Sequence, residues 1–369
     1  MLSKLNPLII GNLEIEIPII QGGMGVKVST SSLASAVANC GAAGTIASVG
    51  LGYGTPENEN NYIKASGDAF RDEIRKARAL TSRVIGANIM VALTNYEDLV
   101  KIAAKEGVDY IVSGAGLPLS LPGIVNDASV KLLPIVSSSR AADIIIRTWK
   151  KRYDYIPDAI VVEGPSAGGH LGFKFNDLVS GGAPHLKKLM LDVLKIVGEY
   201  EREHNVKIPV IAAGGIFNGK DIADFIKLGA SGVQIATRFV ATFECSVADE
   251  FKELYLAAGE EDVIIIESPV GLPGRVIKTD LIERVTTGKR IPVKCNYRCL
   301  KTCDPLTTPY CIAEALFNAS SGKLDEAVVF AGSNVPRIKK IVSVKELLDE
   351  IVGEAINELN KGISLGEKP

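Results

Sequence analysis

Short apolar runs alternate with longer stretches of mixed polarity along most of this chain. Eight of these runs are rich in β-branched residues, and each is followed by small or polar residues and then by a segment long enough for a helix. Strands that are apolar on both faces are typical of a parallel sheet covered by helices. Eight strand–helix units match a closed barrel, so the pattern predicts an α/β fold, a (β/α)8 TIM barrel. The runs are residues 18–21, 42–48, 84–90, 110–116, 131–136, 159–163, 209–215 and 232–237.

An open, doubly wound sheet is the alternative arrangement of the same units. In such a sheet the ligand-binding residues gather at one switch point between strands. Here glycine or polar residues follow nearly every predicted strand, which favours the barrel.

The alternation stops at both ends of the chain. Residues 8–17 alternate apolar and polar around Gly11-Asn12, which predicts a β-hairpin that plugs one end of the barrel. After residue 258 there is a strand-like run at 263–266, and then helices near 311–319 and 344–359. We therefore expect a barrel domain over residues 1–258. A smaller, mostly helical appendage over residues 259–369 is expected to cover the active-site mouth.

The composition narrows the class of protein and its partners. Hydrophobic residues make up 47% of the 369 residues and charged residues 23%, which is ordinary for a packed domain. The net charge of -2 argues against a nucleic acid or an anionic membrane as the main partner. No apolar run approaches the roughly 20 residues of a membrane span, and residues 1–7 do not resemble a secretory signal. We expect a cytoplasmic protein with a small-molecule substrate, and a homodimer stays open.

The carboxyl ends of the predicted strands carry residues suited to a bound cofactor. Ligands bind at this edge of a barrel, and phosphate groups commonly sit on the loops after the seventh and eighth strands. Those loops contain Gly214 with Gly215, and Ala236 with Thr237, which offer amide and hydroxyl groups to a phosphate. The other strand ends supply a ring of groups that suits a flat heterocycle such as a flavin: Gly22, Gly23, Met24, Asn88, Ser113 and Glu163.

A glycine-rich turn follows the sixth run and ends at a histidine. Gly164, Gly168 and Gly169 let the backbone approach a flat or phosphorylated ligand, because they carry no Cβ. His170 at the edge of this turn is a candidate catalytic residue, since imidazole exchanges protons near neutral pH. The other histidines, His185 and His204, are expected at the surface.

Four motifs resemble the nitronate monooxygenase family, also called 2-nitropropane dioxygenase-like, which includes the flavin-dependent enoyl-acyl-carrier-protein reductases. The matching segments are residues 18–24, 163–170, 213–216 and 232–239, in the family's order. The resemblance implies an FMN-binding barrel, with Gly22, Gly23 and Met24 along the isoalloxazine. It further implies that the remaining matched residues lie by the polar edge, the ribityl chain or the phosphate: Asn88, Glu163, Gly168, Gly169, Gly214, Gly215, Ala236 and Thr237.

The same resemblance implies an activity. His170 matches the family's active-site histidine, and we expect an FMN-dependent nitronate monooxygenase that oxidises alkyl nitronates or nitroalkanes with oxygen. The alternative is an enoyl-acyl-carrier-protein or quinone reductase that uses NAD(P)H as co-substrate. A non-catalytic flavin store is a third possibility, which the presence of His170 disfavours.

A cluster of cysteines lies outside the resemblance. Cys295, Cys299, Cys303 and Cys311 fall within seventeen residues, and spacings of four place the first three on one stripe if the segment is helical. Four thiolates could bind zinc or an iron–sulfur cluster, although neither the usual zinc pairs nor a ferredoxin spacing is present. A redox-active pair and free structural thiols are the other interpretations.

Overall fold

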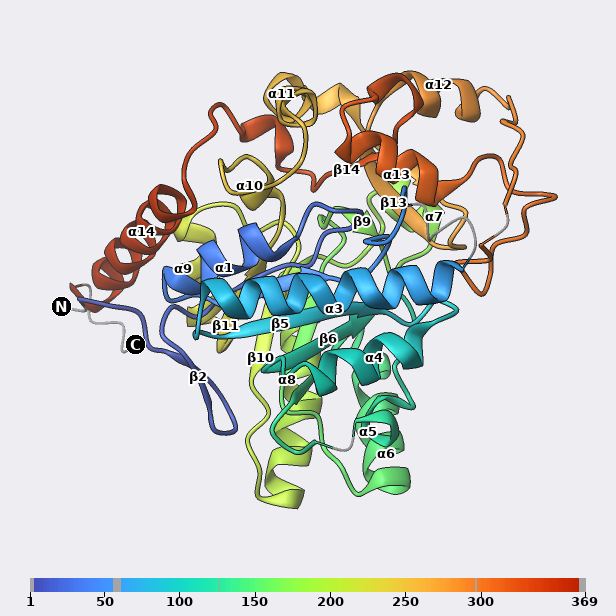
Figure 1. Ribbon diagram of the computed structural model, residues 1–369. Coiled ribbons are helices and arrows are strands. Elements are labelled where there is room, and N and C mark those ends of the chain that lie inside the picture. The colour runs from blue at the N-terminus through green and yellow to red at the C-terminus, as the bar shows by residue number, and fades with distance from the viewer. Residues whose placement is uncertain (1–2, 56–60, 126, 296, 365–369) are drawn as a thin grey trace.

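The computed structural model describes residues 3–55, 61–125, 127–295 and 297–364, and it contains a closed barrel of eight parallel strands (Figure 1). Neighbouring strands pair in the order β3-β11-β10-β8-β7-β6-β5-β4. Backbone bonds from Gln21 N to Ala43 O and from Ala43 N to Ile19 O, both 2.9 Å, close the ring between its first and last strands. The (β/α)8 prediction is confirmed, and each strand lies within its predicted run: β3 (Ile19–Gln21), β4 (Gly44–Ala47), β5 (Ile85–Met90), β6 (Tyr110–Gly114), β7 (Lys131–Val136), β8 (Ile160–Glu163), β10 (Val210–Ala213) and β11 (Gly232–Ile235).

Helices surround the barrel, and several begin at capping residues visible in the sequence. The side chain of Ser138 accepts a hydrogen bond from Ala141 N, and Asn218 and Asp221 form a complete capping box. These helices are α1 (Ser31–Asn39), α3 (Tyr62–Leu80), α4 (Tyr96–Lys105), α5 (Leu121–Ile124), α6 (Ser139–Tyr153), α7 (Phe175–Val179), α8 (Leu186–His204), α9 (Gly219–Lys227) and α10 (Thr237–Val240). None of the helices in the described ranges has the length and apolar character that a membrane crossing requires.

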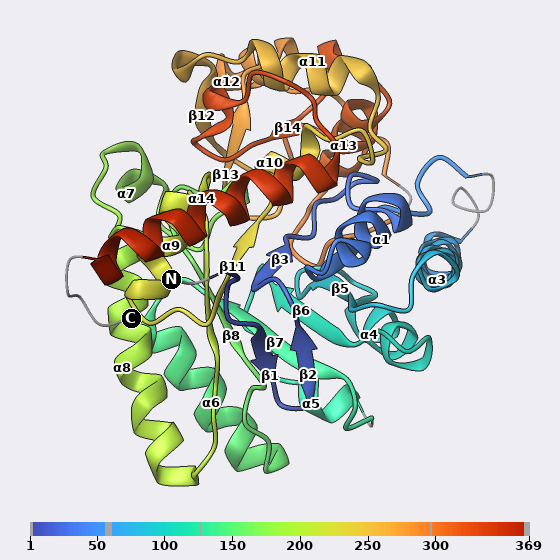
Figure 2. The ribbon, with the colours of Figure 1, turned by 90° about the vertical axis from the view of Figure 1, so that its left-hand side faces the viewer.

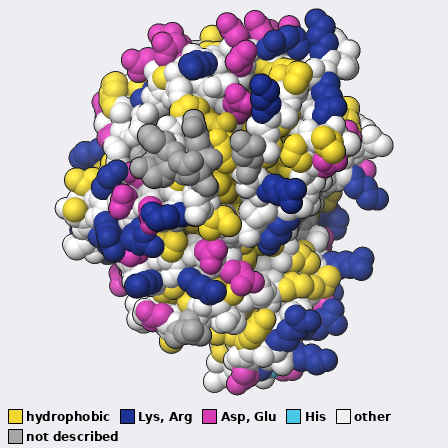
Figure 3. Space-filling model, turned by 45° about the vertical axis from the view of Figure 1, so that its right-hand side comes forward, with side chains coloured by type: hydrophobic (Ala, Val, Ile, Leu, Met, Phe, Trp, Pro, Cys, Tyr) yellow, Lys and Arg dark blue, Asp and Glu magenta, His cyan; other side chains and the backbone are white. Residues whose placement is uncertain are grey.

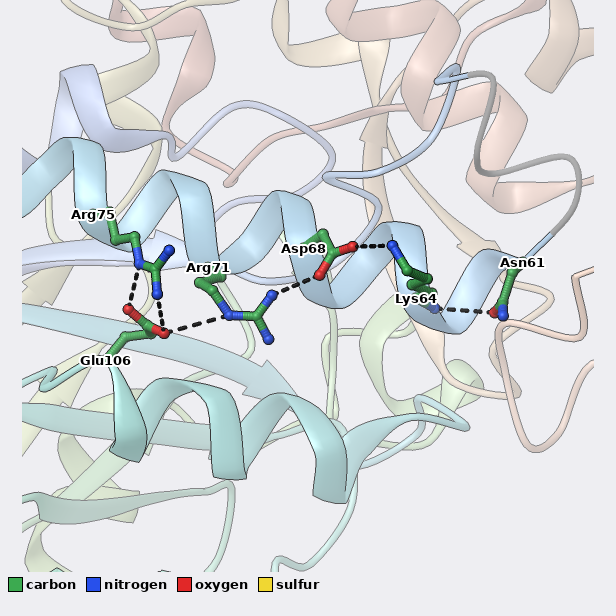
Figure 4. A network of polar contacts seen from close by, with 6 residues as sticks. All are labelled: Asn61, Lys64, Asp68, Arg71, Arg75 and Glu106. Atoms are coloured by element: carbon green, nitrogen blue, oxygen red, sulfur yellow. Dashed lines mark hydrogen bonds and ion pairs between the residues drawn. The ribbon is translucent and has the colours of Figure 1, made fainter.

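Ion pairs connect α3 to the end of α4 (Figure 4). Arg71 bonds Asp68 on its own helix at 2.6 Å, and Arg75 reaches Glu106 at 2.7 Å. Because each pair includes an exposed side chain, each contributes about 1 kcal/mol at most. A similar mixture of basic and acidic side chains covers much of the face shown in Figure 3.

The N-terminal hairpin closes one end of the barrel, as predicted. Strand β1 (Leu8–Ile10) pairs antiparallel with β2 (Leu13–Ile15). Leu8, Ile10 and Ile15 are buried in the same apolar cluster as residues inside the barrel. A Cβ on Gly232, the first residue of β11, would lie 3.1 Å from Leu8 Cδ2. The hairpin therefore covers the amino ends of the strands and leaves their carboxyl ends for ligands.

Most of the C-terminal region lies over the opposite end of the barrel and contains a sheet as well as helices, whereas its last helix packs along α9 on the side of the barrel (Figures 1 and 2). Strand β13 (Pro273–Ile277) pairs antiparallel with three others: β12 (Val263–Glu267), β14 (Val329–Phe330) and β9 (Gly169–His170). The sequence prediction of a mostly helical region did not include this sheet, because two of its strands are only two residues long. The helices are α11 (Asp249–Ala257), α12 (Asp280–Thr286), α13 (Ile312–Ser320) and α14 (Val344–Ser364), with short 3-10 turns at Glu260–Asp262, Leu324–Glu326 and Val335–Arg337.

Close packing of α1 on β4 predicts a large effect of one added methyl group. A Cβ on Gly44 would lie 1.9 Å from the carbonyl oxygen of Ala34, so Gly44→Ala should lower the free energy of unfolding by about 3 kcal/mol. Gly198 in α8 is the matched control, because no atom lies within 4 Å of its added Cβ. Gly198→Ala should raise stability by about 0.5–1 kcal/mol. Urea unfolding of both variants measures the difference, and equal effects would contradict this packing.

Candidate active site

A cavity opens at the carboxyl ends of the barrel strands, beneath the C-terminal region. Residues from the barrel loops line one side of it, and apolar residues from the C-terminal region line the other. The structure brings most of the sequence-predicted site residues together around this cavity: Gly22, Gly23, Met24, Asn88, Glu163, Gly168, Gly169, His170, Ala236 and Thr237.

The loop after β3 is held in place by two buried polar side chains. Gln21 donates from Nε2 to Ser29 Oγ at 2.7 Å and accepts from Thr45 N at 3.0 Å. Ser29 Oγ in turn accepts from Met24 N at 2.9 Å. Gln21 belongs to the matched segment 18–24 and was expected to supply an amide at the strand end, whereas Ser29 was not predicted.

Gly23 is required by its contact with Asn88. A Cβ on Gly23 would lie 2.2 Å from the Cβ of Asn88, well inside van der Waals contact. The absence of a side chain at Gly23 therefore leaves Asn88 room to reach the cavity. Among the described residues the side-chain amide of Asn88 has no hydrogen-bond partner, so it is available to a ligand.

Glu163 ends β8 and borders the same cavity. Its carboxyl group forms no hydrogen bond or ion pair with any residue in the described part of the chain. Burial raises the pKa of Glu163 to about 8, so the carboxyl is mostly protonated at neutral pH and can donate a hydrogen bond.

This shift predicts a pH dependence of stability. The unfolded Glu163 carboxyl loses its proton near pH 4.5, whereas the folded one keeps it to about 8. Because the folded state then binds the extra proton, Glu163 should reduce stability as the pH rises through this window. Glu163→Gln should remove that decline, which is a few kcal/mol at most. The urea midpoint of both proteins between these pH values measures it, and parallel profiles would contradict the assignment.

His170 is positioned by residues distant in sequence. It lies on β9, which pairs with β13, and its Nε2 is 2.8 Å from Ser268 Oγ. The ring of Phe330 contacts the imidazole edge-to-face with centroids 4.8 Å apart. Burial lowers the pKa of His170 to about 4, so the imidazole is neutral at neutral pH. Ser268 and Phe330 were not predicted, because no sequence pattern relates them to the histidine.

The predicted phosphate loops lie beside the cavity and have free donors. Gly214 and Gly215 both have positive φ, 87° and 90°, and neither of their amides donates to another described residue. Thr237 Oγ1 accepts from the amide of Gly332 at 3.0 Å, and the Asn334 side chain donates to Gly215 O at 2.7 Å. This glycine turn has the backbone geometry and the donors that a phosphate group needs.

The predicted flavin ring fits the remaining residues of the cavity. Gly22 and Gly23 leave an open backbone surface, and a Cβ on Gly22 would lie 3.1 Å from that of Ala236. Asn88 and Glu163 add unpaired polar groups at the same opening. An open glycine backbone flanked by hydrogen-bonding groups suits a flat heterocycle.

Three of the predicted cofactor-binding residues do not line the cavity: Gly214 and Gly215, which lie beside it, and Ser113. The side chain of Ser113 points outward from β6, where the hydroxyl donates to Ile89 O at 2.9 Å and lies 3.0 Å from Tyr96 Oη of α4. Alternate side chains along a strand point in opposite directions, which explains its position.

The predicted four-cysteine metal site is not formed. Outside position 296, residues 289–311 contain neither a helix nor a strand, so the spacings of four do not place the thiols on a helical stripe. Of the four, only Cys299 lines the cavity, and burial raises its pKa to about 12. Cys295, Cys303 and Cys311 nevertheless lie close enough to Cys299 to contribute to this rise in the pKa of its thiol. Within the described ranges no three His, Cys, Asp or Glu side chains are arranged to hold a metal ion. The described chain has free cysteines at all four positions.

The histidines outside the site lie on α8. His185, just before the helix, is exposed as expected, whereas His204 is half-buried and stacks on Tyr200 with ring centroids 6.1 Å apart.

The ionisable groups around the cavity are uncharged at neutral pH. Glu163 is protonated and His170 is neutral, while burial raises the pKa of the tyrosines and of Cys299. No lysine or arginine occurs among the described lining residues. The wall opposite the barrel loops is apolar, formed by Val270, Leu300, Ile312, Ala313, Leu316, Ala319, Val328 and Phe330. Such a cavity favours an uncharged substrate with an apolar body.

Comparisons with known proteins agree with this geometry. The family model for nitronate monooxygenase matches residues 6–354. A 5-hydroxy-7a-methyl-1-oxo-octahydro-1H-indene-4-carboxyl-CoA dehydrogenase of Mycobacterium tuberculosis is 27% identical over 96% of this chain and 97% of its own length. A probable nitronate monooxygenase of Staphylococcus aureus is 29% identical over 74% of this chain and 79% of its own. The structure of FabK from Thermotoga maritima is 28% identical, with a TM-score of 0.72 over 95% of this chain and 96% of its own. The chain belongs to the nitronate monooxygenase family of flavin-dependent oxidoreductases.

Proposed function

We propose that this protein is an FMN-dependent oxidoreductase that acts on a thioester with a bulky, uncharged acyl group. The observation that carries the proposal is the cavity, which has an apolar wall and no charged side chain at neutral pH. The CoA-dehydrogenase name of a relative that matches nearly the whole chain supports the thioester. A thioester substrate also agrees with the alternative activity expected from the sequence, that of an enoyl-acyl-carrier-protein reductase.

Each group of site residues has a role toward FMN. Gly22, Gly23 and Met24 would lie along the ring system, with Asn88 and Glu163 as donors to its polar groups. Gly214, Gly215 and Thr237 would hold the phosphate. Bound FMN supplies hydride transfer, which no amino-acid side chain provides.

The protein side of the reaction centres on His170. Ser268 occupies its Nε2, which leaves Nδ1 without a partner among the described residues. A neutral imidazole held in this way can take a proton from the substrate and return it. The apolar wall excludes water from the reacting atoms and binds the acyl body.

Ser268→Ala should therefore lower kcat by about tenfold, because His170 loses the partner that fixes its ring orientation. The flavin content should not change, since Ser268 does not line the cavity. Steady-state kinetics measures kcat, and the visible absorbance of the purified variant measures its flavin content. Ser129→Ala is the control, because Ser129 is exposed and bonds only Asp127. An unchanged kcat would exclude this role.

Oxidation of nitroalkanes or nitronates with oxygen is the second candidate. Removal of the proton beside a nitro group requires a base. His170 is neutral at neutral pH and can accept that proton, which favours nitroalkane oxidation. The anionic nitronate fits less well, because no cationic side chain lines the described cavity.

One anaerobic experiment separates the two candidates. The protein loaded with FMN is mixed with NADH, NADPH, a branched 2-enoyl-CoA or propionate-3-nitronate, and the flavin absorbance is followed. We expect NADH or NADPH to bleach the flavin and the enoyl-CoA to restore its colour. Rapid reduction by the nitronate, with none by either nicotinamide, would instead support nitronate oxidation.

A further inference from the structure

Arg275 holds the turn that precedes His170. It lies on β13 opposite Gly169 of β9. Its Nη1 donates to the carbonyl oxygens of Pro165, at 2.5 Å, and Ala167, at 2.7 Å. The guanidinium thus holds the turn on both sides of Ser166.

This turn packs directly against the predicted phosphate loop. A Cβ on Gly215 would lie 2.8 Å from Ser166 Cβ, and a Cβ on Gly214 would lie 2.9 Å from Ala167 Cβ. The hydroxyl of Ser166 has no hydrogen-bond partner among the described residues. Arg275 is therefore bonded to the turn that packs on the glycine loop with the free amides.

The main chain of Arg275 is also connected to the second phosphate loop. Its carbonyl oxygen accepts from Ala331 N at 3.2 Å. The next residue, Gly332, donates to Thr237 Oγ1. Arg275 is thus connected to the turn beside the first phosphate loop through its side chain, and to Thr237 of the second loop through its main chain.

The positive charge of Arg275 is not neutralised by any carboxylate in the described part of the chain. The side chain is largely buried, and desolvation lowers its pKa, but a guanidinium stays protonated in proteins. Burying a cation without an anion is costly, and two carbonyl oxygens offset only part of that cost. The surroundings of Arg275 therefore favour a bound anion.

Two further arginines lie near these loops. Arg238 follows Thr237 directly, but it forms an ion pair with Glu350 at 2.9 Å and packs on the ring of Phe217. Arg337 packs on the same ring, with its Cζ 4.1 Å from the centroid. Arg275 is the arginine that bonds the turn before His170.

We propose that Arg275 is the counter-charge of the cofactor's phosphate group and holds the 164–168 turn against the Gly214–Gly215 loop. This inference rests on the proposed FMN cofactor. Because a charge acts on the phosphate and not on the ring system, Arg275 should distinguish FMN from riboflavin, which has the same ring without the phosphate.

The test measures the affinity of flavin-free, full-length protein for FMN and for riboflavin by fluorescence quenching. Arg275→Gln keeps a hydrogen-bond donor but removes the charge. It should raise the Kd for FMN by at least about tenfold and that for riboflavin by less than about threefold. Arg275→Lys keeps the charge and should retain most of the preference for FMN. Arg284→Gln is the control, because Arg284 lies on α12 and bonds only the carbonyl oxygens of Asp280 and Asp325 among the described residues, and it should change neither affinity.

The possible outcomes separate the inference from the cofactor proposal. Equal weakening of both flavins by Arg275→Gln, or no change in either, would overturn the counter-charge. If circular dichroism shows that the Gln variant does not fold, Arg275→Met and Arg275→Lys replace it. Preference for FMN must then be lost with Met and kept with Lys, and any other result overturns the inference. Failure of the unmodified protein to bind either flavin would reject the cofactor proposal itself.

Discussion

Replacing His170 by Asn should lower kcat by at least about 100-fold while the protein keeps its flavin. Asn is polar and smaller than His, so it fits the same space, but it cannot take or give a proton. The neutral imidazole is the proton acceptor best placed in the cavity, since Glu163 is protonated at neutral pH. The loss should therefore appear with the thioester and with neutral nitroalkane alike.

The measurement compares kcat and flavin content of the variant with those of the unmodified protein. His185→Asn is the matched control, because His185 is exposed just before α8, away from the cavity. A kcat for His170→Asn within about threefold of the unmodified value would rule out proton transfer by this residue, since general acid–base catalysis usually contributes much more. Loss of the flavin would instead assign His170 to cofactor binding.

The barrel could be predicted from the sequence because its strands are buried on both faces. Runs such as 159–162 and 209–213 are apolar throughout, and only a parallel sheet covered by helices explains eight such runs in regular alternation with helices. The glycines at the strand ends were equally informative, since Gly214 and Gly215 occupy backbone conformations that other residues rarely adopt.

Features that depend on contacts between distant residues could not be predicted. Ser268 meets His170 across 98 residues, and the two-residue strand that places the histidine has no pattern of its own. The conformation of the cysteine segment also depends on a contact with a distant residue. Its spacing aligns the thiols only in a helix, but the backbone of Cys299 instead accepts from Thr94 N at 3.1 Å.

Helix α3 differs from these cases, because the sequence did contain its signal. From the sequence, only a segment of helix length was expected after the second strand. Asn61, however, caps the helix through Lys64 N, and Phe70, Ile74 and Ala77 recur at the spacing of one buried helix face. An N-cap followed by this spacing predicts a helix, so the sequence was sufficient to place α3.

The flavin site should also be sensitive to one methyl group at Gly23. Gly23→Ala places a Cβ 2.2 Å from that of Asn88, and neither backbone can move away easily. Gly23 lies between Gln21, which is bonded to Ser29, and Met24, whose amide also bonds Ser29, while Asn88 is part of β5. The loop must therefore shift into the space predicted for the flavin ring. We expect the purified variant to be nearly colourless, with an FMN affinity lowered by at least about 100-fold.

A double-mutant cycle tests whether this contact is the cause. Asn88→Gly removes the Cβ that collides with the methyl group added by Gly23→Ala. It also removes the side-chain amide proposed to bind the flavin, so alone it should weaken FMN binding by about tenfold. If the collision is responsible, adding Gly23→Ala to Asn88→Gly should cost little more, because the two changes share one contact. If Gly23→Ala weakens FMN binding as strongly in the Asn88→Gly background as in the unmodified protein, the glycine acts through its own backbone conformation. The close approach of the loop after β3 to β5 would then not be the reason for glycine at this position.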